Sequence, residues 1–460
     1  MDTSTFCRFF YKKCLIIKFI ACQTAIINYP TTVQRNSPGH VILSMCSLPY
    51  GGTEMIPKLE EYKERWQIES DQSIKPGLTA IEEALTLIGN PEKSLKVIHV
   101  TGTNGKGSTI RFMEAILEEH GYSTGVFSSP ALIDIHDQIR LNGSPISPEV
   151  LETSFQTMKE AGLSGKLTDF ELLTVAAFVT FQKKAPDYVL VETGMGGLLD
   201  STNIVQPTVS VITSVALDHG SFLGESIQEV AKHKAGIIKK DVPVVVGTLP
   251  EEALKIVCKT AEQKNAQLKI YGEHFSVVEK RVEIFEGAKS FSIPKRKMKG
   301  AHQKLNMAVA IETLSIAGVK LHEQKLQVAV ATAQLHYRFQ EVFPGVIFDG
   351  AHNPAAAAAL AQTIQSEFPG EKVDFFIGML QGKDIEGTLN ELIPVAESFT
   401  FLTFDHSDAA TGQRLLAKCH HPRKSVTTIN VGSIMLGGAS ENKKIVTGSL
   451  YLLSGLKYMV

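Results

Sequence analysis

Residues 97–109 read Val-Ile-His-Val-Thr-Gly-Thr-Asn-Gly-Lys-Gly-Ser-Thr, a β-branched run that leads into a glycine-rich turn. Helical periodicity follows over residues 108–119, so the predicted context is strand, turn and helix. Glycines let backbone N–H groups approach phosphate oxygens, and the N-terminus of the helix adds a favourable dipole. We therefore predict a nucleotide-phosphate loop formed by Thr103, Asn104, Gly105, Lys106, Gly107, Ser108 and Thr109.

The side chains of this loop suit phosphate chemistry. Lys106 can meet the β- and γ-phosphates, and the hydroxyl of Ser108 or Thr109 can bind Mg²⁺. The spacing is unusual, because two residues rather than four separate Gly102 from Gly105-Lys106. The alternative is an ordinary tight strand-to-helix turn, but a lysine between two glycines favours phosphate binding.

Short apolar runs alternate with helical stretches over most of the chain. Strands are predicted at 96–100, 188–192, 209–215, 244–246, 346–349, 375–379, 399–404 and 445–447, and helices at 108–119, 170–181, 306–317 and 355–367. Apolar strands between amphipathic helices indicate parallel sheets that are covered on both faces. We predict an α/β fold: a mostly parallel sheet domain with the phosphate loop over residues 55–335, then a smaller Rossmann-like α/β domain over residues 338–460.

The first 54 residues differ in composition from the rest. Residues 1–53 carry five Lys or Arg and one Asp, a net charge of +4, which leaves −6 for the remainder of a chain of net charge −2. They are predicted to be either an upstream, non-native extension of a cytoplasmic protein or a transit peptide that directs it to mitochondria.

The whole-chain composition excludes some classes of partner. The chain has 46 Lys and Arg against 48 Asp and Glu, so it offers no electrostatic case for a nucleic-acid or membrane partner. Its apolar runs are shorter than the roughly 20 residues that span a bilayer.

Polar side chains follow two later predicted strands. Glu192 ends the strand at 188–192, and Asp218-His219 follows the strand at 209–215. Ligands of parallel sheets bind where the strands end, and carboxylate and imidazole groups there can bind Mg²⁺ or polarise its water. A helix cap or surface ion pair for Glu192 and a plain hydrogen-bonding role for His219 are the alternatives. Lys234, near Lys232, Lys239 and Lys240, reads from spacing alone as a solvated helix residue.

The C-terminal part offers a second set of polar groups. Arg338 presents a fork for phosphate oxygens, and Asp349 or His352 can make polar contacts to a nucleotide. Pro354 suits the first turn of the following Ala-rich helix, so Asn353 is predicted as its cap.

Eight segments, in one order along the chain, resemble the folylpolyglutamate synthase/dihydrofolate synthase family of Mur-type ATP-dependent amide ligases. They are residues 99–108, 128–130, 192–197, 199–203, 217–219, 234–237, His302-Gln303 with Asn306, and 349–354. The resemblance implies a ligase that uses ATP and Mg²⁺ to add L-glutamate to the γ-carboxylate of tetrahydrofolate (poly)glutamates through an acyl phosphate. The alternatives are a dihydrofolate synthase that joins glutamate to dihydropteroate, one protein with both activities, and a P-loop nucleotide-binding relative without ligase activity.

The resemblance also implies roles for single residues. Lys106, Lys234 and His352 would be catalytic, Ser108 with Glu192 would bind one Mg²⁺, and His219 would serve a second. Lys234 would be carbamylated, and its added carboxylate would support that metal. The contacts to ATP beyond the phosphate loop would come from Asn306 at adenine and from Arg338 and Asp349. Expected partners are reduced folate, glutamate and ATP, without nucleic acid or membrane, and the expected state is a monomer.

Three positions depart from the family's usual pattern. Ala131 stands where the family usually has His, Asp137-Gln138 where it has Glu-Arg, and Leu198 where it has Arg. Most of them are expected on the substrate side of the pocket, so they bear on the pterin substrate more than on the ATP chemistry.

Overall fold

Residues 97–109 form the strand, turn and helix that the sequence predicts. The protein is described by a computed structural model over residues 58–71, 77–428 and 442–457, so the predictions for residues 1–54 lie outside the described residues. Strand β2 (Val97–Thr101) leads into the turn and helix α4 (Lys106–Glu119) leaves it. Gly105 caps the helix at φ +88°, a backbone conformation that glycine adopts without strain.

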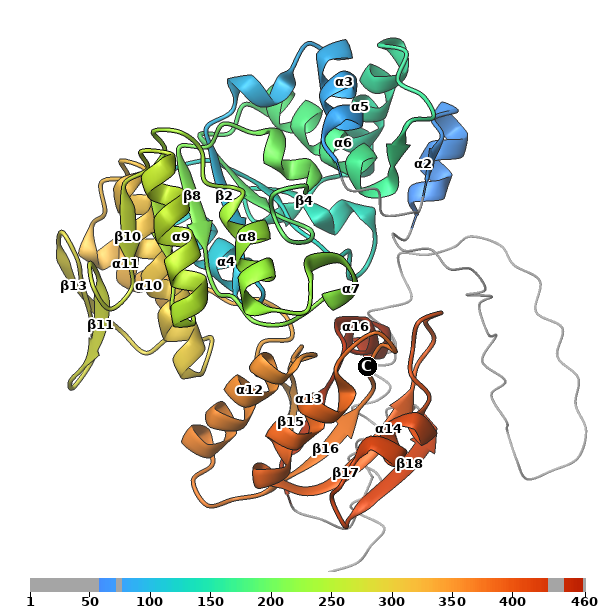
Figure 1. Ribbon diagram of the computed structural model, residues 1–460, viewed down its shortest axis with the longest axis vertical. Coiled ribbons are helices and arrows are strands. Elements are labelled where there is room, and N and C mark those ends of the chain that lie inside the picture. Colours follow the sequence, from blue (N-terminus) through green and yellow to red (C-terminus); the bar gives the residue numbers. More distant parts are fainter. Residues whose placement is uncertain (1–57, 72–76, 429–441, 458–460) are drawn as a thin grey trace, which may run out of the picture. The chain divides into compact units, whose positions relative to one another are not determined.

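Strand β2 lies near the middle of an eight-stranded sheet (Figure 1). The strands follow the order β10 (Leu268–Ile270), β9 (Val244–Val246), β8 (Val209–Ile212), β2, β7 (Tyr188–Glu192), β3 (Thr124–Phe127), β4 (Ile139–Leu141) and β5 (Ser144–Pro145). All pairs are parallel except β3–β4 and β4–β5. Val100 pairs with Glu192 and Thr101 with Ile212, which brings the carboxyl ends of β2, β7 and β8 together.

Helices cover both faces of this sheet. One face packs against α4, α10 (Ala301–Ile316) and α11 (Glu323–Thr332). The other face packs against α2 (Leu59–Trp66), α3 (Thr79–Leu87), α5 (Pro148–Glu160) and α6 (Asp169–Lys184) near one edge, and against α8 (Ile227–Ala235) and α9 (Glu251–Gln263) near the other. This two-sided burial explains why the central strands are apolar at nearly every position.

Some small elements were not predicted from the sequence. An antiparallel sheet of β11 (Ser276–Glu279), β12 (Glu283–Glu286) and β13 (Ser290–Ile293) packs against the core cluster that contains α10 and α11. The remaining short elements are the parallel pair β1 (Ser70–Asp71) and β6 (Leu167–Thr168), helix α7 (Gly220–Leu223), and 3₁₀ turns at Pro91–Ser94, Ile135–Gln138, Ser201–Ile204 and Ile393–Val395.

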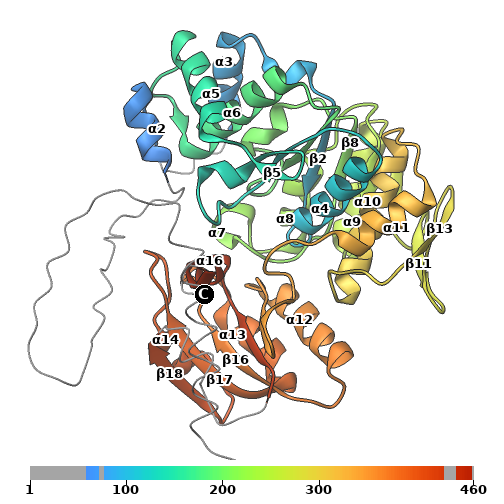
Figure 2. The ribbon, with the colours of Figure 1, turned by 180° about the vertical axis from the view of Figure 1, so that it is seen from behind.

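The C-terminal part forms a second, six-stranded sheet, coloured orange to red in Figures 1 and 2. Its order is β14 (Gln340–Phe343), β15 (Val346–Phe348), β19 (Lys444–Thr447), β16 (Val373–Ile377), β17 (Ala396–Thr403) and β18 (Lys424–Thr428), and only β14 is antiparallel. Helices α12 (Pro354–Glu367), α13 (Ile385–Leu392) and α14 (Gly412–Lys418) pack on one face, and α16 (Leu450–Lys457) on the other.

The α/β prediction with two mostly parallel sheets is confirmed. Residues 52–460 form one compact unit, and the division between residues 335 and 338 stays a prediction. Within the described ranges, no helix has both the length and the apolar character needed to cross a membrane.

Candidate active site

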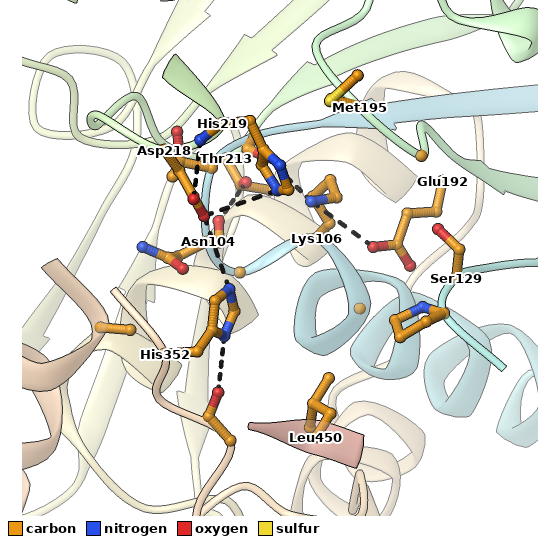
Figure 3. A pocket seen from close by; sticks show the side chains of 18 of the residues that line it. Asn104, Lys106, Ser129, Glu192, Met195, Thr213, Asp218, His219, His352 and Leu450 are labelled. Atoms are coloured by element: carbon orange, nitrogen blue, oxygen red, sulfur yellow. Dashed lines mark hydrogen bonds and ion pairs between the residues drawn. The ribbon is translucent and has the colours of Figure 1, made fainter. Parts of the chain in front are cut away.

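Loops at the carboxyl ends of both sheets line one pocket of about 780 Å³ (Figure 3). All but one of the site residues predicted from the sequence line it: Thr103, Asn104, Gly105, Lys106, Gly107, Ser108, Glu192, His219, Lys234, Asn306, Arg338, Asp349 and His352. The exception is Thr109, which is fully buried within α4 and does not line the pocket. Of the two hydroxyls predicted for Mg²⁺, the structure therefore places only that of Ser108 at the pocket.

The phosphate loop is held against the end of β8. The Asn104 backbone N–H donates to Ser214 Oγ at 2.9 Å, and the hydroxyls of Thr213 and Ser214 donate to the Asn104 carbonyl at 2.7 and 2.9 Å. A Cβ on Gly102 would lie 1.9 Å from Thr213 Oγ1, so only glycine fits there. Lys106 Nζ donates to the Gly102 carbonyl at 3.0 Å, which folds the lysine back over its own loop.

A chain of side chains connects the phosphate loop to α10. Asn306 Nδ2 donates to Gln303 Oε1 at 3.1 Å, and Gln303 Nε2 donates to Ser108 Oγ at 3.2 Å. Asn306 and Gln303 are both buried. Gly105 lies against Asn306, because a Cβ there would be 2.5 Å from Asn306 Oδ1. The position predicted for adenine contact is thus coupled to the residues predicted for phosphate and Mg²⁺.

Glu192 is a buried carboxylate that faces a cation. It is 6% exposed, and its Oε1 lies 3.8 Å from Lys106 Nζ. Burial raises the pKa of Glu192, and the positive charges of Lys106, Arg338 and Arg140 oppose that rise. A carboxylate whose ionisation is resisted by burial is stabilised by a bound cation, and carboxylate oxygens are preferred ligands of Mg²⁺. Glu192 and Ser108 therefore fit a bound Mg²⁺.

Lys234 is buried, so its interpretation as a solvated helix lysine is wrong. It is 2% exposed at the end of α8 and lines the pocket. Burial, and then the charge of Lys106, lower the pKa of Lys234 to about 7. The neighbouring backbone is fixed, because the Leu198 N–H donates to the His233 carbonyl at 2.7 Å and Asn203 Nδ2 donates to the Gly236 carbonyl at 3.2 Å. Near neutral pH a large fraction of this amine is uncharged and therefore nucleophilic.

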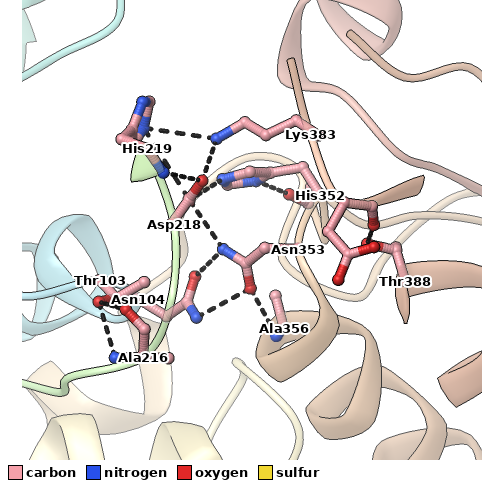
Figure 4. Close-up of polar contacts among 12 residues, drawn as sticks. Thr103, Asn104, Ala216, Asp218, His219, His352, Asn353, Ala356, Lys383 and Thr388 are labelled. Carbon is pink, nitrogen blue, oxygen red and sulfur yellow. Dashed lines mark hydrogen bonds and ion pairs between the residues drawn. The ribbon is translucent and has the colours of Figure 1, made fainter. Parts of the chain in front are cut away.

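Asp218 is the centre of a polar cluster at the pocket (Figure 4). Its carboxylate lies 2.7 Å from Lys383 Nζ, 3.6 Å from His352 Nε2 and 3.1 Å from the donating Nδ2 of Asn353. Burial by itself would raise the pKa of Asp218, but the close contact with His352 and the positive charge of Lys383 hold it well below its usual range. Asp218 is therefore an anion that joins the loop after β8 to loops of the C-terminal sheet.

His219 sits at the edge of this cluster. Its side chain is 47% exposed, and Nε2 lies 3.4 Å from Lys383 Nζ and 3.9 Å from Asp218 Oδ2. Partial burial of the ring and then the charge of Lys383 lower the pKa of His219 to about 4, so the imidazole is neutral at pH 7, as a metal ligand must be. Among the residues that the structure describes, no three His, Cys, Asp or Glu side chains are already grouped as a metal site.

Asn353 caps α12, as predicted, and also bonds to Asn104 in the phosphate loop. Its Oδ1 accepts from the Ala356 N–H at 2.9 Å, and its amide exchanges hydrogen bonds with that of Asn104 at 3.1 and 3.2 Å. Sequence reasoning missed this second role, and it missed Lys383 altogether. The only signal for Lys383 is its place in the loop that follows β16, at the carboxyl edge of a parallel sheet.

Asp349 holds its own loop in place. Its two carboxylate oxygens accept from the backbone N–H groups of Phe339 and Ala351, each at 2.9 Å. Burial raises the pKa of Asp349, and the charge of Arg338 is the largest opposing effect. Arg338 packs beside Gly350, where a Cβ would lie 2.4 Å from its Nη1. Asp349 thus positions the turn that carries Arg338 and His352.

The three departures from the family's pattern do not share one location. Ala131 and Gln138 are buried and line the pocket. Leu198 is 44% exposed and does not line it. Asp137, next to Gln138, accepts from the backbone N–H groups of Leu132 and Ile133 at 3.0 and 2.7 Å and so shapes the loop.

Comparison with known proteins identifies the family. The profile of the Mur ligase middle domain matches residues 100–314, and that of the dihydrofolate synthetase C-terminal domain matches residues 334–459. The dihydrofolate synthase/folylpolyglutamate synthase of Bacillus subtilis is 32% identical over 410 residues, which are 84% of this chain and 95% of that protein.

Solved structures agree with this assignment. Escherichia coli FolC in complex with DHPP and ADP is 30% identical with a TM-score of 0.79, over 87% of this chain and 96% of that one. A bifunctional folylpolyglutamate synthase/dihydrofolate synthase with Mn, AMPPNP and L-glutamate bound is 28% identical with a TM-score of 0.76, over 84% and 94% of the two chains. The resemblance drawn from the motifs is confirmed: the chain belongs to the dihydrofolate synthase/folylpolyglutamate synthase family.

Proposed function

We propose that this protein is an ATP-dependent ligase that joins L-glutamate to the carboxylate of a folate-type acceptor, with release of ADP and phosphate. The observation that carries the proposal is the single pocket in which the phosphate loop, Glu192, Lys234 and the C-terminal residues Arg338 and His352 converge. The relatives named above support it, since the solved ones hold ADP or AMPPNP and one holds L-glutamate.

The reaction has two steps. An oxygen of the acceptor carboxylate attacks the γ-phosphorus of ATP, the bond to the bridging oxygen breaks, and an acyl phosphate and ADP form. The amine of glutamate then attacks the acyl carbon, loses a proton, and displaces phosphate to give the amide. Positioning and electrostatic stabilisation of the transferring phosphoryl group dominate such catalysis.

The residues of the first sheet would hold the nucleotide and metal. The amides of the phosphate loop and Lys106 would bind the β- and γ-phosphates, and Asn306 would contact adenine. Ser108 and Glu192 would bind one Mg²⁺, and His219 a second. Bound Mg²⁺ supplies charge neutralisation at the phosphates.

Lys234 would act as a carbamate. Carbamylation requires an uncharged amine, and the lowered pKa of Lys234 provides one near neutral pH. Its uncharged nitrogen would attack CO₂ and lose a proton, which would convert a buried amine into a buried carboxylate in the pocket that His219 also lines.

The residues of the C-terminal sheet would close the site. His352 Nδ1 donates to the Gly350 carbonyl at 2.9 Å, which leaves Nε2 directed toward Asp218 and the pocket. Arg338 would contact phosphate oxygens, in a turn fixed by Asp349. Enclosure by these groups would exclude water and protect the acyl phosphate from hydrolysis.

Two acceptors fit this chemistry. Tetrahydrofolate (poly)glutamates would make the protein a folylpolyglutamate synthase, and dihydropteroate would make it a dihydrofolate synthase. The match of residues 334–459 to a dihydrofolate synthetase C-terminal domain favours including the second activity.

The test is incorporation of labelled glutamate in the presence of ATP and Mg²⁺, with tetrahydrofolate and dihydropteroate offered separately. We expect labelled product and equimolar ADP with at least one acceptor. Absence of product with both acceptors, in a preparation that binds ATP, would refute the ligase proposal.

A further inference from the structure

The pocket-lining residues Ser129, Pro130, Ala131 and Gln138 include a buried polar atom without a partner among the described residues. Gln138 is 2% exposed and lines the pocket. Its Oε1 has no hydrogen-bond partner among the residues that the structure describes. Because an unpaired buried acceptor is destabilising, such an atom in a native protein requires an explanation, and a ligand donor is one.

The surrounding backbone holds Gln138 in place. Its own carbonyl accepts from the Ser128 N–H at 3.0 Å, and the next residue, Ile139, pairs with Phe127 between β4 and β3. The preceding turn is tied to α2, because His136 Nε2 lies 2.8 Å from the Tyr62 hydroxyl. The unpaired oxygen therefore belongs to a buried residue whose backbone is fixed, and it does not reflect a loosely packed loop.

Other side chains of the pocket lining define what can bind there. Pro130, Ala131 and Phe170 add apolar surface, and Asp169 and Glu171 add carboxylates, of which that of Asp169 is paired with Lys63 at 3.1 Å. The Glu171 carboxylate already accepts from the Thr168 N–H at 2.8 Å. Apolar surface with acceptor oxygens nearby is complementary to a heteroaromatic ring that carries N–H donors.

The side chain at position 138 can also accept a hydrogen bond, which the arginine of the family pattern cannot do. An arginine there offers only donors and a positive charge, whereas glutamine offers an acceptor and no charge. The unpaired atom in this chain is the acceptor, Oε1.

We propose that Gln138 determines acceptor specificity, its Oε1 accepting a hydrogen bond from an N–H group on the heterocyclic head of the acceptor substrate. This inference rests on the proposed ligase function and adds to it the chemistry of the head that the pocket selects. Gln138 contacts the end of the acceptor that does not react, so it acts on binding and not on the phosphoryl or amide chemistry.

The test compares an acceptor that has the head with one that lacks it. Dihydropteroate carries an N–H-rich heterocycle, and 4-(benzylamino)benzoate keeps the reacting carboxylate and aryl ring without it. Gln138→Met and Gln138→Leu remove the acceptor oxygen at similar volume, and Gln138→Glu retains an oxygen at the same reach. Steady-state ADP release gives kcat and KM for both acceptors and for ATP and glutamate.

We expect Gln138→Met and Gln138→Leu to raise KM for dihydropteroate by about five- to tenfold, the loss of one hydrogen bond. Their kcat/KM for the benzyl compound and their KM for ATP and glutamate should stay at wild-type values, and Gln138→Glu should stay within about threefold for dihydropteroate. Equal losses for both acceptors, or unchanged KM for dihydropteroate, would overturn the inference while leaving the ligase intact. A wild-type protein that forms product with neither dihydropteroate nor tetrahydrofolate would instead refute the proposed function itself.

Discussion

The contact between Gly105 and Asn306 gives a prediction that can be worked out from the structure. Gly105 has φ +88°, and a Cβ on it would lie 2.5 Å from Asn306 Oδ1. Gly89 has φ +89°, and a Cβ on it would meet nothing within 4 Å. Alanine at either position therefore has the same left-handed strain, about 1–2 kcal/mol, and only Gly105→Ala also displaces a neighbour.

The displacement has a calculable cost. Asn306 must withdraw by roughly 1 Å to reach ordinary contact distance, and it is held by its 3.1 Å hydrogen bond to Gln303. Breaking that bond leaves a buried Gln303 oxygen unpaired, which costs about 1–3 kcal/mol. Because Asn306 is predicted to contact adenine, its displacement should also remove that contact, and the loss of about 1–3 kcal/mol of binding free energy would weaken ATP binding by roughly 5- to 150-fold.

The assay is isothermal titration of ATP into wild type, Gly105→Ala and Gly89→Ala, with urea unfolding of all three. Both variants should lose about 1–2 kcal/mol of unfolding free energy or more, but only Gly105→Ala should lose nucleotide affinity. If Gly105→Ala binds ATP as tightly as Gly89→Ala, the coupling of the phosphate loop to Asn306 is refuted.

Three further predictions concern buried groups. Lys234→Ala should bind ATP yet form no product, even with added bicarbonate. The control is Lys232→Ala, on the exposed side of the same helix, which should form product at the wild-type rate. Product from Lys234→Ala in the labelled-glutamate assay would contradict the carbamate role. Burial of His99 lowers its pKa to about 3, so as the pH falls from about 6.5 the unfolded chain is protonated first. Below pH 6.5 the unfolding free energy of wild type should therefore fall by about 1.4 kcal/mol per pH unit more than that of His99→Gln. The measurement is urea unfolding of both proteins at pH 7 and pH 5, and an equal loss of unfolding free energy in the two proteins would disprove the prediction. Thr168 forms a capping box with Glu171 at the start of α6, so Thr168→Ala should lower the unfolding free energy by about 1 kcal/mol and Thr168→Ser should largely restore it, as measured by urea unfolding.

Much of the central architecture follows from local sequence patterns. The strands at 188–192 and 244–246 were predicted at their observed limits, because buried parallel strands are uninterrupted apolar runs. The short antiparallel strands β4 and β5 at one side of the large sheet and the small β11–β13 sheet were not predicted. Edge and surface strands mix polar with apolar residues, so their short segments lack such a signal.

The residues of the site likewise divide into those that local sequence predicts and those that depend on tertiary packing. The phosphate loop could be predicted because glycine, lysine and a helix start occur within a few residues. Lys234 could not be recognised from spacing, because its burial depends on tertiary packing of α8 against the loop at 197–203. Lys383 contacts Asp218 across 165 residues of sequence, and no local pattern encodes such a pairing.

Because Asn353 has two roles, stability and activity measurements should rank its substitutions differently. One oxygen atom serves both helix α12, through Ala356, and the pocket, through Asn104. Serine, threonine and aspartate are all good helix caps, so a selection for thermal stability would rank them close to asparagine. None of them carries the amide N–H₂ that reaches Asn104 and Asp218, and aspartate would place a second anion beside Asp218. The serine, threonine and aspartate variants should thus resemble wild type in a stability screen and differ from it in a screen for ligase activity. A design method that scores only folding would not distinguish asparagine from these residues at position 353.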